Sequence, residues 1–215
     1  MPPLECKNLP FRTTHQSREV EPEGFSDRFQ SGEIIGFCDD RDFGSLLNIL
    51  GMIERPSSGS LSVLGENVLE MQENEAWQLR DRAFGYLFTH PHLLPTFTVA
   101  ENVAMPFFRI CGKREDLASE RTSEVLLFTG IRHLCGTLVG NLDDSTRWLV
   151  ALARAIVHRP PLLAAISPPS PDLLPLARTL ADTEGMAILW NGEKKDLLPF
   201  ADRILDGGCP SRLAP

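Results

Sequence analysis

The sequence predicts one domain of the α/β class, a mixed sheet flanked by helices, with an N-terminal antiparallel β part and a helical subdomain inserted into the core. Short apolar runs of strand length alternate with longer amphipathic segments of helical length. The first thirty residues are polar and contain several prolines, which favours edge strands joined by loops. The 215 residues suffice for a single large domain over 1–215, and 42% hydrophobic and 23% charged residues are ordinary globular values.

The first α/β unit lies in the N-terminal third of the chain. A short apolar run at 33–38 predicts a core strand, and the polar stretch 39–42 predicts a loop. Leucines and an isoleucine at helical spacing predict a helix over 43–52. A turn at 56–59 precedes a further strand at 60–64. This order of strand, loop, helix and strand is typical of α/β folds.

The rest of the chain continues the alternation. A second core strand is expected at 84–88, and the segment from about 99 to 150 is mostly helical, which predicts the inserted subdomain. The elements expected after it are a buried strand at 162–166, a helix at 173–182, a strand at 187–190 and short elements near 201–205. The sheet core therefore contains residues from both sides of the insertion.

Charge and cysteine usage exclude several classes of function. The net charge is −8, so the chain is a poor candidate for binding a nucleic-acid backbone. No apolar run reaches the roughly 20 residues that span a bilayer, and the N-terminus lacks a secretion pattern, so direct membrane insertion is not expected. The five scattered cysteines predict reduced thiols in the cytosol. His90 and His92 have no flanking acidic or cysteine ligands, so no metal site is expected.

Three ordered segments carry a resemblance to a known family. They are residues 45–51 with 55–59, residues 93–106, and residues 150–157 with 159–160. In sequence and separation they resemble the ATP-binding subunit of an ABC transporter, most closely the lipoprotein-release, cell-division and macrolide-exporter branch. The resemblance covers most of residues 4–206. It implies a P-loop ATPase-like core and, for an intact member, ATP hydrolysis coupled to transport.

The phosphate-binding loop of that family is the first motif from which this chain departs. Such a loop needs glycines, a lysine for the β/γ-phosphates and a Ser/Thr hydroxyl on Mg²⁺. The corresponding segment, 39–45, is about two residues shorter than the pattern, and Phe43 takes the lysine position. No lysine lies between Lys7 and Lys113 to replace it. The candidate residues of a relic phosphate loop are Arg41, Gly44 and Ser45.

The remaining catalytic positions of the family are also changed. Ile166 and Ser167 stand where it carries a metal-binding Asp and a catalytic Glu, and neither residue can bind a metal or take a proton from water. The other replacements are Thr89 for a glutamine, Gly192 for a histidine, Leu142-Asp143-Asp144-Ser145 for Leu-Ser-Gly-Gly, and Thr13, with Phe11 nearby, for the aromatic on adenine. We therefore expect no catalytic residue, no metal and no cofactor. ATP and Mg²⁺ are expected only if an atypical phosphate loop still functions.

Aspartates precede two helices whose N-termini would hold phosphate in the family. A helix N-terminus without its anion exposes unpaired N–H groups and a positive dipole. Asp42 comes before the helix predicted at Phe43, and Asp143 or Asp144 before the helix around Arg147. The hypothesis is that these carboxylates occupy the former anion sites. The alternative is that they are exposed and solvated.

The segment after the second core strand keeps the resemblance best. In the family it lines the groove that receives a cytoplasmic helix of the membrane subunit. Its apolar residues form either such a groove or ordinary core of the helical insertion. The candidate partner-binding residues are Leu93, Leu94, Phe97, Val103, Met105, Phe107 and Phe108. A charge at Phe97 or Met105 is expected to weaken binding if that residue lines the groove.

The resemblance and the departures from it together predict a degenerate, non-hydrolysing ATP-binding-cassette subunit. Its expected partners are a membrane permease subunit and an active homologous ATPase or a second copy, with no nucleic acid. Its expected location is the cytoplasm, peripheral at the inner membrane through the permease. One alternative is a working ATP-binding subunit of a lipoprotein-release-type exporter. The other is a soluble interaction or regulatory protein derived from the family.

Overall fold

The computed structural model describes residues 1–10, 24–38, 40–112, 115–166 and 170–206, without the side chains of residues 40–42 and 206. The strands are β1 (Leu4–Leu9), β2 (Phe25–Phe29), β3 (Ile34–Cys38), β4 (Ser60–Val63), β5 (Glu66–Asn67), β6 (Phe84–Leu87), β7 (Leu162–Ala165), β8 (Ala187–Asn191) and β9 (Arg203–Asp206). The α-helices are α1 (Asp40–Leu50), α2 (Glu73–Ala83), α3 (Val99–Cys111), α4 (Glu115–Phe128), α5 (Asp144–Ile156), α6 (Leu174–Glu184) and α7 (Lys194–Leu197). Short 3₁₀ turns are η1 (Val68–Glu70), η2 (Arg132–Leu134), η3 (Val139–Asn141) and η4 (Pro171–Leu173).

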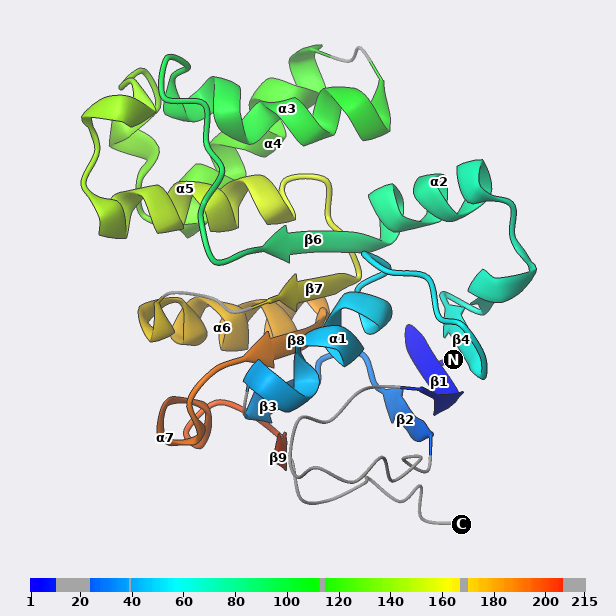
Figure 1. Cartoon of the computed structure of the whole chain (residues 1–215). Coiled ribbons are helices and arrows are strands. Elements are labelled where there is room, and N and C mark those ends of the chain that lie inside the picture. Colours follow the sequence, from blue (N-terminus) through cyan, green and yellow to red (C-terminus); the bar gives the residue numbers. More distant parts are fainter. Residues whose placement is uncertain (11–23, 39, 113–114, 167–169, 207–215) are drawn as a thin grey trace.

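The strands form two sheets, which confirms the α/β class (Figure 1). An antiparallel sheet has the order β2-β1-β4-β5, and a parallel sheet has the order β6-β7-β8-β3-β9. The parallel strands are joined through helices, as parallel pairing requires. β3 lies between β8 and β9, and β6 is an edge strand. The carboxyl ends of β3, β7 and β8 consequently meet at one edge of the parallel sheet.

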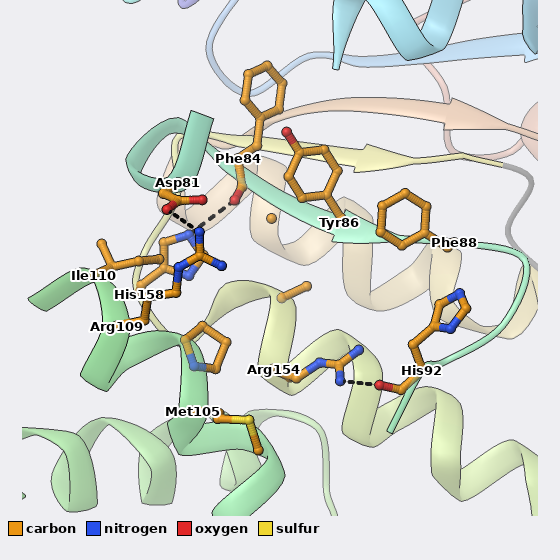
Figure 2. A pocket seen from close by; sticks show the side chains of 13 residues that line it. Asp81, Phe84, Tyr86, Phe88, His92, Met105, Arg109, Ile110, Arg154 and His158 are labelled. Atoms are coloured by element: carbon orange, nitrogen blue, oxygen red, sulfur yellow. Dashed lines mark hydrogen bonds and ion pairs between the residues drawn. The ribbon is translucent and has the colours of Figure 1, made fainter. Parts of the chain in front are cut away.

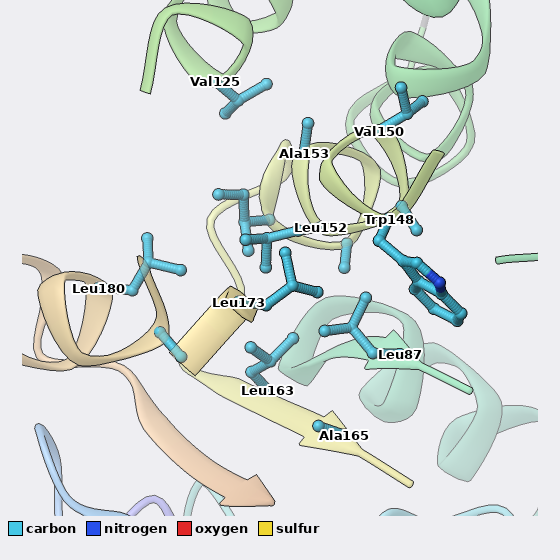
Figure 3. Packing of buried hydrophobic residues seen from close by; sticks show 14 of the residues in the cluster. Leu87, Val125, Trp148, Val150, Leu152, Ala153, Leu163, Ala165, Leu173 and Leu180 are labelled. Carbon is cyan, nitrogen blue, oxygen red and sulfur yellow. The ribbon is translucent and has the colours of Figure 1, made fainter. Parts of the chain in front are cut away.

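Two apolar clusters pack on the opposite faces of the parallel sheet. Alternate residues of a strand point to opposite faces. On β3, Ile34 packs with residues of α5 and α6, whereas Ile35 and Phe37 pack with α1 and the antiparallel sheet. Figure 3 shows the first cluster, with Leu163 of β7 beneath Leu152 of α5. Helices therefore cover both faces, which explains why every residue of β3 is buried.

Helices α3, α4 and α5 pack against one another and occupy most of the range 99–150 (Figure 1). α5 also contributes Val150, Leu152 and Ile156 to the cluster on the sheet. Glycine allows its close approach to β6, because a Cβ at Gly85 would lie 2.2 Å from the carbonyl oxygen of Ala155. The helical subdomain at about 99–150 stays a prediction, since α5 belongs to both parts.

Candidate functional site

The start of α1 differs from the sequence prediction. β3 ends at Cys38 and α1 begins at Asp40, so the predicted loop is wrong for residues 40–42, as is a helix start at Phe43, and residue 39 lies outside the described residues. Asp42 is likewise not a residue that precedes the helix, because it lies in the first turn. Negative residues are favourable in a first turn, where they oppose the helix dipole. The helix therefore extends over residues that the sequence pattern assigned to a loop.

The relic phosphate-loop residues lie inside this helix. In an α-helix that begins at Asp40, the N–H groups of Gly44 and Ser45 bond to carbonyls four residues earlier. These N–H groups are then not free to bind a phosphate. The side chain of Arg41, the third candidate, lies outside the described residues. Only one residue connects β3 to α1, and a connection of this length is too short to wrap around an anion.

Phe43 explains why the helix begins early. Its side chain is 3% exposed, and its ring packs edge-to-face on Phe37 of β3, with the ring centroids 5.6 Å apart. Leu46, Leu47 and Leu50 follow on the same buried face. The position that the resemblance gives to a lysine thus carries an apolar anchor of α1. An aromatic pair of this geometry contributes about 0.5–1.5 kcal/mol beyond burial of its area.

The ends of β7 and β8 complete this edge of the sheet. Ile166 packs against the cluster beneath α1, and its N–H donates to the carbonyl of Leu87 at 2.8 Å. Gly192 donates its N–H to the carbonyl of Phe37 at 3.1 Å. Asn191 is 1% exposed, and its amide nitrogen and oxygen have no hydrogen-bond partner among the described residues. Ser167, Phe11 and Thr13 lie outside the described residues.

A carboxylate of the chain itself caps the N-terminus of α5, as the hypothesis for Asp143 or Asp144 predicted. Asp143 is the N-cap residue, and its carboxylate accepts the N–H of Thr146 at 2.7 Å. It also accepts the hydroxyls of Ser145 at 2.6 Å and Thr146 at 3.0 Å. These bonds lower the pKa of Asp143 to about 2, and the bond from the hydroxyl of Ser145 has the largest effect. A side chain of the protein therefore fills the anion-binding position of this helix.

The segment between β6 and α3 is held by one buried amide. Asn102 accepts the N–H of Leu94 at 2.8 Å and donates to the carbonyls of Leu94, Phe97 and Thr98. Thr98 and Glu101 form a capping box at the start of α3. These bonds tie residues 94–98 to the first turn of α3. Sequence reasoning singled out the apolar residues of this segment and missed Asn102.

A cavity of about 620 Å³ opens at the edge of β6, between that strand and helices α3 and α5. We call it the β6 cavity. Figure 2 shows the rings of Phe84, Tyr86 and Phe88 in a row along β6, with Met105 and Arg154 on the helices opposite. Its lining residues are Asp81, Phe84, Gly85, Tyr86, Phe88, His92, Met105, Pro106, Arg109, Ile110, Arg154, Ala155 and His158.

Charged groups surround the apolar part of the β6 cavity. Arg109 and Asp81 form an exposed ion pair at 2.7 Å. Arg154 donates to the carbonyls of Pro91 and His92, at 2.5 and 2.7 Å, and burial lowers its pKa. Burial also lowers the pKa of His158, whose Nε2 lies 3.2 Å from the carbonyl oxygen of Phe84. These side chains tie α3 to α2, α5 to the loop after β6, and the chain just after α5 to β6 itself.

A second cavity, of about 640 Å³, lies between α3 and α4. We call it the α3–α4 cavity. Of the predicted partner-binding residues, Phe97, Met105 and Phe108 line it, and Met105 also lines the β6 cavity. Leu94 is exposed, whereas Leu93 and Phe107 are half-buried against the core. Val103 is 0% exposed, so its assignment to a docking groove is wrong. It belongs to the core because it lies on the inner face of α3.

Sequence reasoning missed most of the β6 cavity. Tyr86 lies far along the chain from Arg154 and His158, and the three residues line one cavity only because α5 packs on β6. The alternation of aromatic residues at 84, 86 and 88 was the one available signal, since it places three rings on one face of a strand. Among the described residues, no helix is long and apolar enough to cross a bilayer, and no His, Cys, Asp and Glu side chains are grouped as metal ligands.

The family model described as ABC transporter matches residues 44–165. A lipoprotein-releasing system ATP-binding protein LolD of Shewanella oneidensis is 36% identical over 124 residues, which are 58% of this chain and 54% of that protein. One of the same name from Alcanivorax borkumensis is 32% identical over 170 residues, 78% of this chain and 74% of that protein. The chain spans about half the length of the first relatives that it matches.

Solved structures show the same fold. A dimeric bacterial ABC transporter cassette superposes with a TM-score of 0.77 at 19% identity, over 94% of this chain and 93% of that one. A protein from Clostridium perfringens, part of the ABC transporter complex cbiONQ, superposes with a TM-score of 0.78 at 20% identity, over 95% and 84%. At these identities the likeness is one of fold.

Proposed function

This chain belongs to the ABC transporter family, and from that premise we propose that it is a non-hydrolysing subunit that docks on a membrane permease. The observation that carries the first part is the start of α1. Phe43 is buried against Phe37 at the position of the phosphate-binding lysine, and a single residue separates β3 from α1. A phosphate loop needs both the lysine and a run of free N–H groups.

The free energies of the contacts that would be lost or added support a loss of phosphate binding. The missing lysine removes a charge-assisted contact of about 1.5–3 kcal/mol. Each aspartate within about 4 Å of a phosphate would cost on the order of 4 kcal/mol at an effective dielectric of 20. Residues 39–42 contribute three aspartates and one arginine at this place. Ile166 also replaces a metal ligand with a side chain that packs beneath α1.

ATP turnover by the purified chain tests this proposal. We expect no Mg²⁺-dependent phosphate release above the level of a heat-denatured sample. Ser45→Ala is the matched variant, because Ser45 is the one candidate of the relic phosphate loop that carries a hydroxyl. Phosphate release by the wild type that Ser45→Ala abolishes would refute the non-hydrolysing assignment.

A working nucleotide site is the second candidate. The relatives are named ATP-binding proteins, and the unpaired amide of Asn191 lies at the carboxyl end of β8, on the sheet face that carries α1. A buried amide without a partner invites a ligand or water. Calorimetric titration with MgATP separates the two candidates. Saturable binding that Asn191→Leu removes supports the second, and no heat of binding supports the first.

The β6 cavity is the proposed docking site for a helix of the permease. It lies where the sheet edge meets α3 and α5, and apolar side chains such as Phe88, Met105 and Ile110 line it beside charged ones. An amphipathic helix binds such a groove by placing its apolar face inside and its polar face at the rim. The Asp81–Arg109 pair lines the same cavity and offers both signs of charge to that polar face.

Membrane fractionation tests the docking site. Co-expressed with a candidate permease of the same organism, the wild type should pellet with membranes, and without it should stay in the supernatant. Ile110→Asp should abolish pelleting, because it leaves an unpaired charge in an apolar contact. Leu127→Asp, on the exposed face of α4, is the matched control and should pellet normally. Pelleting of Ile110→Asp, shown by circular dichroism to be folded, would contradict this site.

Phe97→Asp separates the β6 cavity from the earlier prediction for residues 93–108. Phe97 lines the α3–α4 cavity and does not line the β6 cavity. We therefore expect Phe97→Asp to pellet like the wild type. If it stays soluble while Ile110→Asp pellets, the permease binds the α3–α4 cavity instead. If no variant pellets with any permease, the soluble regulatory alternative gains support.

The proposed dimer partner is an active homologue or a second copy. One of the solved structures of this fold is a dimer. If the family's head-to-tail arrangement is kept, the turn at Asp143 faces the partner's nucleotide. A carboxylate there would repel the phosphates, so we propose that this chain contributes no attractive contact to the partner's site. Size-exclusion chromatography with light scattering, with and without the homologue and MgATP, measures the pairing.

A further inference from the structure

The α3–α4 cavity is separate from the edge of the sheet and from the proposed docking site except at Met105. We propose that it binds a small amphiphilic anion, with an apolar body inside the cavity and an anionic head at Arg132. The proposal does not rest on the proposed function. It rests on the composition of the walls, on an unpaired buried hydroxyl and on an unpaired guanidinium.

The walls of the cavity fit an apolar body. Phe97, Met105 and Phe108 are each about 40% exposed and line it from the α3 side, with Leu126 on α4. Small side chains on both helices leave the space between these larger residues open; they are Ala100, Ala104, Ser119 and Ser123. A volume of about 640 Å³ lies within the range of roughly 300–1,000 Å³ that is typical of small-molecule sites.

The polar residues that carry the proposal are Thr122 and Arg132 in the walls of the cavity. The residue Thr122 is 5% exposed, and its hydroxyl has no hydrogen-bond partner among the described residues, although it lines the cavity. An unpaired buried hydroxyl is costly unless a ligand or water pairs with it. The guanidinium of Arg132, which also lines the cavity, likewise has no hydrogen bond or ion pair with any described residue.

The acidic residue of the cavity does not offset Arg132. The carboxylate of Glu101 accepts the N–H of Thr98 at 2.8 Å and its hydroxyl at 2.7 Å, in the capping box of α3. The groups left to select a ligand are therefore hydroxyls, with the buried one on Thr122, and a cation. The net charge of −8 disfavours non-specific binding of anions to the protein surface. Binding of an anion would therefore indicate a specific site such as this cavity.

The cysteines provide the test. Cys135 is exposed and lines the cavity, whereas Cys111 is exposed and does not line it. Maleimide labelling of the full chain, read by mass spectrometry of the separate peptides, gives the rate at each thiol. Dodecanoate below its micelle concentration should slow labelling of Cys135 at least threefold and leave Cys111 unchanged. Dodecyltrimethylammonium, which has the same tail and a cationic head, should not slow it.

Variants connect the protection to the cavity. Ala104→Trp fills the space and should abolish protection by dodecanoate, and Leu127→Trp on the exposed side of α4 is its matched control. Arg132→Ala should weaken binding of dodecanoate about tenfold and leave that of dodecanol unchanged. Protection that survives Ala104→Trp, or that is equal at both thiols, would overturn the proposal. So would protection seen only with anionic vesicles, because the ligand would then be a membrane surface.

Discussion

The carboxyl edge of the parallel sheet and the segment between β6 and α3 treat their polar groups in opposite ways. At the sheet edge, Phe43 and Ile166 place apolar side chains at the positions that the resemblance would give to a lysine and a metal-binding aspartate, and the amide of Asn191 has no partner among the described residues. In the other segment, Asn102 alone makes four hydrogen bonds to backbone groups. Apolar packing therefore dominates this edge of the sheet, while a hydrogen-bonded amide fixes the segment beside the β6 cavity.

Phe43→Lys tests the edge and has the largest expected effect. It buries a charge in the core beside Phe37 and removes an aromatic contact, so we expect the free energy of unfolding to fall by about 4 kcal/mol or more. Urea unfolding measures the loss, and Phe43→Leu should cost far less. The lysine variant should still release no phosphate, because Ile166 remains at the metal position. A stable, hydrolysing Phe43→Lys protein would mean that the edge kept its chemistry.

Asn102→Leu tests the other side of the comparison. It removes the acceptor of the part-buried N–H of Leu94 and one of the two donors to each of three carbonyls, which keep their backbone donors, so we expect a loss of about 2–3 kcal/mol. Asn141→Leu is the matched control, because Asn141 is exposed and the change should stay within about 0.5 kcal/mol. Equal midpoints for both variants in urea unfolding would show that the amide network does not hold the segment.

Two arginines of the β6 cavity sharpen the distinction between buried and exposed polar contacts. Arg154→Met removes charged hydrogen bonds to the carbonyls of Pro91 and His92, so we expect a loss of about 2 kcal/mol. Arg109→Met removes an ion pair whose arginine side chain is 68% exposed, and should cost less than about 1 kcal/mol. If Arg109→Met lowered the melting temperature more than Arg154→Met, the exposed ion pair would stabilise the fold more than the hydrogen bonds of Arg154.

Asp143 has the smallest expected effect and a distinctive pH dependence. Its pKa is lowered from an ordinary value of 3.8 to about 2. A carboxyl whose pKa is lower in the folded state stabilises the fold above its unfolded pKa, and the stabilisation is lost as pH falls through the folded pKa. The melting temperature of Asp143→Ala should therefore lie below that of the wild type at pH 6, and the two should converge towards pH 2.

Two variants control the Asp143 experiment. Asp143→Asn keeps an acceptor for the N–H of Thr146, so it should retain part of the cap without the pH dependence. Asp144→Ala removes an exposed neighbour that pairs with Arg147 and should change the melting temperature less. A difference between wild type and Asp143→Ala that persists unchanged at pH 2 would rule out the carboxylate as the cap.

Local patterns determined much of this protein from sequence alone. The buried strands and most helices follow from periodicity and turn residues, because these signals lie within a few residues of each other. The cap of Asp143 was predictable for the same reason, since its hydrogen bonds reach only Ser145 and Thr146. The apolar residues Phe43 and Ile166 could also be singled out from the sequence, because spacing sets which positions the resemblance would give to the lysine and the aspartate, although the loss of function at these positions stays a prediction.

The tertiary structure decided the features that depend on distant residues. The first turn of α1, which begins at Asp40, places Phe43 against Phe37 of β3. No local pattern in 39–43 indicates that contact. Val103 is core rather than surface because α3 packs on α5. The β6 cavity joins residues from 81 to 158, and its walls meet only when α5 approaches β6 at Gly85. Sequence spacing sets which residues share a face, whereas the packing of whole elements sets what that face meets.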